Sequence, residues 1–307
     1  MPNNVTHCYF GDLVAQDFHS DAGEAVKAHL DLFYMGANGP DLFFTFRELG
    51  FGIPSLSNLM QFVKTYEVFE SAVQYMRKNP EDTAAYAYFL GLFCHYALDR
   101  VVHPYVNYAV EQGFFADYPK KYQKSIHTII EIYFDEYIIR QKQNLQLVSY
   151  TPAKLVANSK ADRRKMAQIY NDVVFPVYNV RTSEKKMAVS VWIVNFFHKL
   201  LNDKKGRKRA FYEFLEKPIG YAKLTCFLKP VRDGDSYDFL NNGRRPFRII
   251  RNKSEMSTEN FDEMTERARK LCLELTDKFD KACKGGESLR KKDFAINYEG
   301  VMDPLFT

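Results

Sequence analysis

Three side chains that can bind metal recur at four-residue intervals in the segment HYALDRVVHPY, residues 95–105. They are His95, Asp99 and His103, and most residues between them are apolar. On an α-helix, residues four apart share a face and lie about 6 Å apart along the axis, so neighbouring members of the series can reach one ion. His95 and His103 are about 12 Å apart, whereas zinc bonds its ligands at about 2 Å. The spacing therefore indicates two ions, with Asp99 between them.

A second segment, HTIIEIYFDEY at residues 127–137, repeats the four-residue step with His127, Glu131 and Asp135. Histidine and carboxylate ligands on one helix face are typical of zinc sites in helical metalloenzymes, although iron and manganese accept the same set. A single histidine on an apolar helix is more often a hydrogen-bonded core residue. Two helices that each carry a histidine and an acid favour the metal interpretation, because a buried acid is costly unless it is paired or bound to metal.

The elements that must position these side chains are predicted to be helices. Helical patterns cover residues 54–78, 79–113, 119–142, 182–203, 207–216, 257–284 and parts of 153–178. In the second of these, Asn79 is the expected N-cap and Pro80 the first helical residue. Pro104 predicts a kink or break near His103.

Alternating strand patterns are scarce, so the predicted fold class is all-α. We expect one mostly helical domain over residues 1–307, with the metal-binding half in 1–142. Additional helices are expected in 143–307, around a long irregular connection at 217–256 that is rich in proline and glycine.

Composition and charge limit the partners. The chain has 307 residues, 46% of them hydrophobic, and a formal net charge of only +5, which is too small to indicate nucleic acid by itself. Basic residues concentrate in 204–209 and 241–253, which are either solvated loops or contacts for an anionic membrane surface or polyanion. The most apolar stretch, 187–201, is too short for a transmembrane segment and indicates a core helix or an interfacial amphipathic helix.

Cysteine usage and the N-terminal sequence bear on location. The five cysteines are an odd number without CxxC spacing, which argues against a disulfide framework and against a thiolate zinc site. The first residues lack the basic and apolar regions of a secretory signal. The expected location is cytoplasmic.

Taken in order, the segments MPNNVTHCYFG, YMGANGPDLFF, FLGLFCHYALDRVVHPYVN and HTIIEIYFD resemble the bacterial zinc-dependent phospholipase C family over about residues 1–140. The resemblance implies a multi-helix fold, shared with certain single-strand nucleases, that binds up to three zinc ions in a cleft. By the same resemblance, His103, His127 and Glu131 form the complete ligand set of one zinc.

The resemblance also assigns a second ion to His95 and Asp99, with Asp99 bridging toward a third ion that His7 partly holds. Asp41, in the GANGPD element, corresponds to a carboxylate that orients or deprotonates the attacking water and can also contact a metal. The alternative for Asp41 is a purely structural role as the cap of the following helix.

Three further residues have open roles. Relatives carry a histidine where this chain has Gln61, and glutamine is a poor zinc ligand, so the ion on His95 and Asp99 is expected to be weakly held, completed by water or absent. His29 either orients a metal ligand by contacting it or is a structural residue on a helix surface. Asp135 either supports the neighbouring ligands in the same way or forms a salt bridge.

The leading functional prediction is a zinc-dependent phosphodiester hydrolase of phospholipase C type that uses metal-activated water. Its substrate would be a phospholipid or another phosphodiester, with possible peripheral membrane contact. One alternative is a nuclease or nucleotidase on the same fold, although nucleic acid is disfavoured as the partner. The other is a catalytically degenerate binding protein that metal stabilises, for which Gln61 is the main support.

Overall fold

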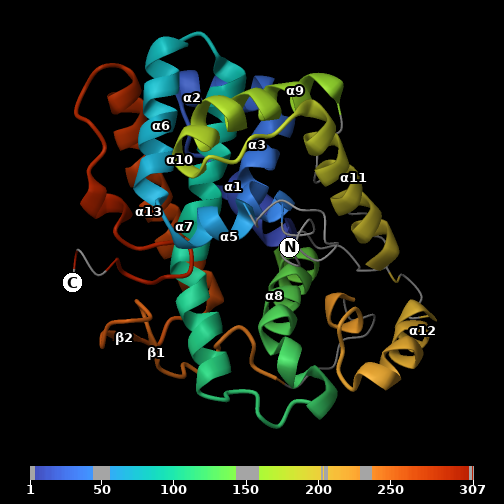
Figure 1. Cartoon of the computed structure of the whole chain (residues 1–307). Coiled ribbons are helices and arrows are strands. Elements are labelled where there is room, and N and C mark those ends of the chain that lie inside the picture. The colour runs from blue at the N-terminus through green and yellow to red at the C-terminus, as the bar shows by residue number, and fades with distance from the viewer. Residues whose placement is uncertain are drawn as a thin grey trace.

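The computed structural model describes residues 4–43, 56–142, 159–201, 203, 207–228, 237–303 and 306. Helices dominate this part of the chain (Figure 1). Its β-structure is limited to the antiparallel pair β1 (Phe247–Arg248) and β2 (Met256–Ser257) and one isolated bridge between Ile296 and Met302. The all-α prediction is confirmed.

The N-terminal elements are α1 (Asn4–Ala15), α2 (Ser20–Ala28), α3 (Leu30–Asn38), the 3₁₀ helix η1 (Gly39–Phe43), α5 (Leu56–Phe62), α6 (Thr65–Lys78), α7 (Thr83–Glu111), the 3₁₀ helix η2 (Lys120–Ser125), α8 (Ile126–Tyr137) and the π-helical turn η3 (Ile138–Lys142). They are followed by α9 (Lys160–Ile169), the π-helical turn η5 (Tyr170–Val174), α10 (Phe175–Tyr178), α11 (Glu184–Leu201), α12 (Arg207–Glu216), the short 3₁₀ helices η6 (Lys217–Ile219) and η7 (Thr225–Phe227), α13 (Phe261–Cys283) and the 3₁₀ helix η8 (Lys291–Phe294).

Helix α7 is the central element of the structure. Most of its residues from Ala85 to Val106 are buried, which a helix achieves only when neighbours cover all of its faces. The neighbours are α3, α13, α2, α1 and α8, and Figure 1 shows α7 running through the middle of the molecule with α8 beside it. Side chains on α7 therefore face protein on every side, so its polar residues need partners.

The start of α7 differs from the prediction. The N-cap is Asp82, whose carboxylate accepts a hydrogen bond from the Ala85 backbone N–H at 3.1 Å. Asn79 instead ends α6, because its backbone N–H and its side-chain amide both donate to the Tyr75 carbonyl. Asn79 and Asp82 are both good capping residues, and α6 uses the first of them.

Pro104 does not break α7, so of the predicted kink or break the break is wrong. The helix continues to Glu111 with Pro104 inside it. Gly300 packs directly against the proline ring, since a Cβ atom on Gly300 would lie 2.3 Å from Pro104 Cγ. The C-terminal segment thus covers the point where the proline removes a helical hydrogen bond.

Other predicted helices are shorter in the structure. The 54–78 segment is described from Leu56 and divides into α5 and α6 because Lys64 is left-handed, with φ of 58°. The 119–142 segment begins as η2 before α8 starts. Residues 143–158 lie outside the described part, so the start of the predicted 153–178 helix is not tested.

Within the described part of the chain, no helix combines the length and the apolar character that crossing a bilayer requires.

Candidate metal centre

One group of possible ligands joins α1 to α7. His95 Nε2 lies 3.0 Å from Asp99 Oδ2, and His7 Nε2 lies 3.3 Å from Asp99 Oδ1. The two imidazole rings stack with their centroids 4.1 Å apart, and one ligand atom from each of the three residues lies within 4.8 Å of the others. The structure thus places His7 in one group with His95 and Asp99, and the third ion that the family resemblance assigns partly to His7 stays a prediction.

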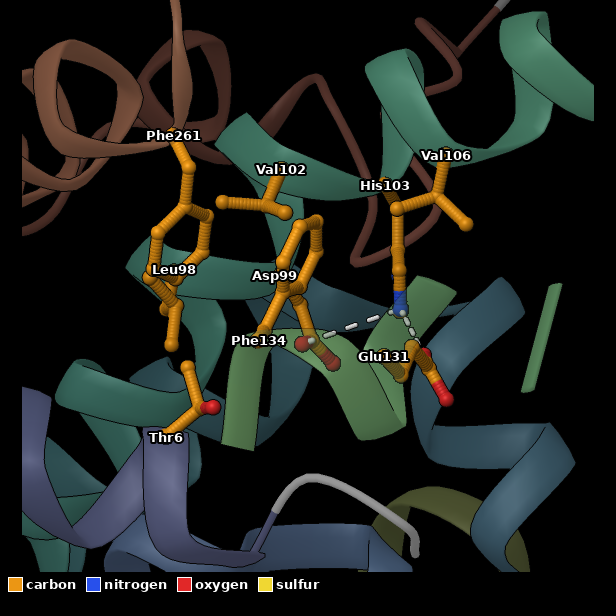
Figure 2. A pocket seen from close by; sticks show the side chains of 9 residues that line it. All are labelled: Thr6, Leu98, Asp99, Val102, His103, Val106, Glu131, Phe134 and Phe261. Carbon is orange, nitrogen blue, oxygen red and sulfur yellow. Dashed lines mark hydrogen bonds and ion pairs between the residues drawn. The ribbon is translucent and has the colours of Figure 1, made fainter. Parts of the chain in front are cut away.

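A second group joins α7 to α8. Glu131 Oε1 lies 3.4 Å from His103 Nε2 and 3.2 Å from His127 Nε2, and the ligand atoms of all three residues again lie within 4.8 Å of one another. Asp99 Oδ1 is 3.8 Å from His103 Nε2, and Figure 2 shows the Asp99 and Glu131 carboxylates approaching the same imidazole nitrogen. Asp99 therefore lies between the two groups, as its spacing on the helix predicted.

The hydrogen bonds of two histidines leave the same ring nitrogen available. His95 Nδ1 is 2.9 Å from the Ala37 carbonyl, and His103 Nδ1 is 3.0 Å from the Tyr298 carbonyl. A carbonyl can only accept, so each Nδ1 carries a proton and donates. In the neutral ring Nε2 then has a lone pair, and this is the atom that faces Asp99 in both cases. Such a backbone bond is the usual device that orients a histidine toward a metal.

The first group has a deficit of hydrogen bonds that a cation would satisfy. His7 Nε2 and His95 Nε2 are buried and make no hydrogen bond, although Asp99 oxygens lie near both. Buried polar atoms are rarely left without a partner. Two imidazole nitrogens and a carboxylate that converge in this way form a donor set that suits zinc.

In both groups, the imidazoles keep the buried acids ionised. Burial disfavours the ionised form of Asp99, but the surrounding imidazoles of His103, His95 and His7 hold its pKa well below the ordinary value. Burial likewise opposes ionisation of Glu131, yet His127 and His103 keep the pKa of that carboxyl low. Both acids are therefore carboxylates that can share a cation with the imidazoles.

Asp41 and Gln61 meet beside the first group. Asp41 lies on η1, and Gln61, on α5, donates from Nε2 to its Oδ1 at 2.8 Å. Burial and the neighbouring His95 lower the pKa of His7, and the nearby Asp41 carboxylate only partly opposes this. Asp99 and then Asp41 raise the pKa of His95 despite its burial. Gly39 makes this approach possible, because a Cβ atom there would lie 2.8 Å from His95 Cγ. Gln61 thus acts on Asp41 by a direct hydrogen bond.

Asp135 and His29 have different surroundings. Asp135 Oδ1 accepts from the Thr6 backbone N–H at 2.9 Å and from the Thr6 hydroxyl at 2.8 Å, so it fixes the start of α1 next to His7. His29 Nε2 is 3.0 Å from the Thr83 hydroxyl at the start of α7, three turns before His95. These contacts favour a supporting role for Asp135 and the structural alternative for His29.

A small pocket adjoins the second group (Figure 2). Its lining residues are Thr6, Leu98, Asp99, Val102, His103, Val106, Glu131, Phe134 and Phe261. Its polar wall consists of Asp99, His103 and Glu131 together with Thr6 of α1, and the apolar wall comes from α7, α8 and the start of α13. The pocket therefore combines charged groups with a hydrophobic surface.

Two supporting residues near the C-terminus were not identified from the sequence. Tyr298 supplies the carbonyl that orients His103, and Glu299 Oε1 lies 3.6 Å from His103 Nδ1. Glu299 is held by Asn107, which donates at 3.0 Å, and by Arg251 at 3.5 Å. No spacing or motif links residues so far apart in sequence, so no sequence signal pointed to them.

Replacing Glu299 by Gln should weaken metal binding at the second group about tenfold, the lower end of the 10- to 100-fold effects typical of residues that orient metal ligands. The reason is that Glu299 raises the pKa of His103 and so makes it a better ligand. Competition with a chromogenic chelator measures the affinity. Glu111→Gln is the matched control, because Glu111 also pairs with Arg251, at 2.7 Å, but has an exposed side chain. Equal effects of the two variants would contradict the assignment.

Comparison with known proteins gives one result. A family model described as zinc dependent phospholipase C matches residues 6–174, more than half of the chain. The matched range contains both ligand groups, Asp41 and Gln61, whereas α11, α12, α13 and the segment with Tyr298 and Glu299 follow it. No curated protein and no solved structure shows significant similarity to the chain.

Proposed function

Because this chain belongs to the zinc-dependent phospholipase C family, it is a hydrolase, and we propose that it cleaves the phosphodiester of a phospholipid with water. The observation that carries the proposal is the pair of ligand groups that share Asp99 on α7. Two adjacent cation positions are the arrangement that many phosphodiester hydrolases use.

The residues divide into ligands and a proton acceptor. His103, His127 and Glu131 would hold one ion, and the group around Asp99 would hold a second. Bound zinc supplies acidification of water and neutralisation of the phosphodiester charge. Asp41 lies at the edge of the first group and is the carboxylate that we propose receives the proton of the attacking water. The hydrogen bond from Gln61 fixes the direction of that carboxylate. A third ion stays a prediction from the family resemblance.

The structure offers less support for nucleic acid as the substrate. Arginines of the basic segment 241–253 are engaged within the chain: Arg245 donates to the Phe114 carbonyl, and Arg251 pairs with Glu111 and Glu299. Charges that are already paired contribute little to binding a polyanion. We therefore retain a phospholipid as the proposed substrate, and a cytoplasmic site of action as a prediction from the sequence.

Removing one ligand of the second group tests the proposal. His127→Ala should lower the hydrolysis of a generic phosphodiester by at least about 100-fold, because even residues that only orient metal ligands contribute 10- to 100-fold. The His127 side chain is 36% exposed, so the variant should fold. Elemental analysis of the purified protein, measured beside activity, should show that the variant has lost zinc.

The control is His29→Ala, which removes another partly exposed histidine that contacts Thr83 instead of a ligand group. Its zinc content and its activity should equal those of the wild type. Fewer than one tightly bound metal per wild-type chain, or activity that His127→Ala leaves unchanged, would contradict the proposed enzyme. Stoichiometric zinc without hydrolysis of any phosphodiester would support the binding-protein alternative.

A further inference from the structure

Helices α11 and α12 carry large apolar side chains on their outer surfaces. Of the thirteen exposed large hydrophobic residues in the described part of the chain, seven lie between residues 189 and 219. They are Val189, Trp192 and Phe196 on α11, Phe211, Phe214 and Leu215 on α12, and Ile219 on η6, with exposed fractions from 45% to 65%. We refer to these seven side chains as the docking face.

The spacing of these residues shows that α11 has two apolar sides. On α11, Val189, Trp192 and Phe196 follow the three- and four-residue steps of one helix face, while Met187, Val191 and Val194 are buried. The inner residues account for the packing of α11 on the protein. The outer ones remain 45% to 62% exposed, and large apolar side chains gathered on an exposed surface mark an interaction site.

Basic side chains accompany the docking face. Arg207, Lys217 and Lys223 are exposed on or just after α12, and Lys217 places its ammonium group 5.7 Å from the centre of the Phe214 ring. Lys185 and Lys186 are exposed at the start of α11. Aromatic and aliphatic residues flanked by lysine and arginine are the composition of protein surfaces that lie in the interface of an anionic membrane.

The docking face is attached to the elements that carry the metal centre. The Arg209 guanidinium on α12 donates to the Tyr122 hydroxyl at 3.1 Å, and Lys121 pairs with Glu213 at 2.9 Å. Tyr122 and Lys121 both belong to η2, and η2 leads directly into α8, which carries His127. Helix α11 contacts η1, which carries Asp41. Figure 1 shows α11 and α12 together at the periphery of the molecule, on the side of α8.

We propose that the docking face of α11, α12 and η6 inserts into the surface of a phospholipid bilayer that contains anionic lipids. The inference rests on the proposed function in choosing a phospholipid surface as the occupant, and it adds a binding site that follows the matched residues 6–174. Binding there would hold the metal centre next to the membrane, because α11 and α12 are anchored to the segments that position Asp41 and His127.

The chain contains its own reporter for this binding, since Trp192 is its single tryptophan and is 62% exposed. Vesicles made of equal parts phosphatidylcholine and phosphatidylserine should shift its fluorescence emission to shorter wavelengths, because the indole moves from water into the lipid interface. Vesicles of phosphatidylcholine alone should bind more weakly, and added salt should weaken binding to the mixed vesicles.

The test variant is Phe214→Ser combined with Leu215→Ser, which keeps the reporter. Both side chains are exposed, so the fold should be retained, and affinity for the mixed vesicles should fall at least about tenfold as apolar surface is lost from the interface. The control combines Leu30→Ser with Met256→Ser, each 43% exposed and outside the docking face. It should bind vesicles as the wild type does.

Three results would overturn the inference: no emission shift with any vesicle, equal weakening in the control, or a shift produced by a single-stranded oligonucleotide in place of vesicles. Hydrolysis of a water-soluble phosphodiester separates this inference from the proposed function. If the wild type binds vesicles but hydrolyses nothing, the docking face stands and the proposed function fails. If it hydrolyses the soluble substrate but does not bind vesicles, only the docking face is rejected.

Discussion

Asp99→Asn is expected to lower hydrolysis by at least about 200-fold and to remove metal from both ligand groups. The carboxylate lies 3.0 Å from His95, 3.3 Å from His7 and 3.8 Å from His103, so it is the one charge that both groups share. Removing one partner of a buried charge pair costs about 3–5 kcal/mol, which corresponds to roughly 200- to 5,000-fold in affinity. Elemental analysis and phosphodiester hydrolysis measure the two effects.

The matched control is Asp12→Asn. Asp12 is a partly buried acid on α1 that accepts a hydrogen bond from the Tyr34 hydroxyl at 2.7 Å, a bond that the amide oxygen of asparagine can also accept. Its metal content and activity should stay near those of the wild type. If Asp99→Asn lost only one metal, the interpretation of Asp99 as the shared ligand would be wrong, and the two groups would be independent sites.

The arrangement of ligands along each helix could be predicted from the sequence. A four-residue step fixes both the direction and the separation of side chains on an α-helix, so the position of Asp99 between His95 and His103 required only that α7 be helical. The same reasoning applied to His127 and Glu131 on α8. Local geometry was sufficient for these residues because each set lies within one element.

The positions of side chains that come together only when separate helices and segments pack could not be predicted from residue spacing. His7 lies on α1, and its stacking on His95 of α7 depends on how α1 packs, with Thr6 at the start of α1 bonded to Asp135 on α8. The supporting role of Glu299 depends on the C-terminal segment, which returns to α7 from far along the chain. Neither contact has a signature in residue spacing, since it arises only when the chain has folded.

The predicted start of α7 was wrong for a related reason. Asn79 and Asp82 both have side chains that cap helices, and the sequence alone does not state which helix each one serves. The apolar stretch 187–201 was predicted as a core helix or an interfacial one. In the structure α11 buries Met187, Val191 and Val194 and exposes Val189, Trp192 and Phe196, so the core packing is present and the interfacial role stays a proposal.

The contact between α3 and α7 places Asp41 beside the first ligand group. Helix α3 leads into η1 with Asp41, and α7 carries His95. The two backbones touch where Gly36 and Gly91 face each other. A Cβ atom on Gly36 would lie 2.0 Å from the Tyr88 carbonyl oxygen, and one on Gly91 would lie 2.1 Å from the Phe33 carbonyl oxygen. These are backbone atoms within helices, which cannot move aside as a flexible side chain can.

Gly91→Ala is therefore expected to lower the free energy of unfolding by about 3 kcal/mol or more, the upper range for overpacking of a core. The loss should occur even though alanine favours a helix interior by about 1 kcal/mol over glycine. Urea unfolding measures it, and zinc content should fall because α3 and α7 are pushed apart. Gly113→Ala is the control: its φ of +63° disfavours alanine, but the nearest atom is 3.7 Å away, so only a backbone cost of about 1–2 kcal/mol is expected. A smaller loss for Gly91→Ala than for Gly113→Ala would show that the close approach of α3 and α7 does not limit this fold.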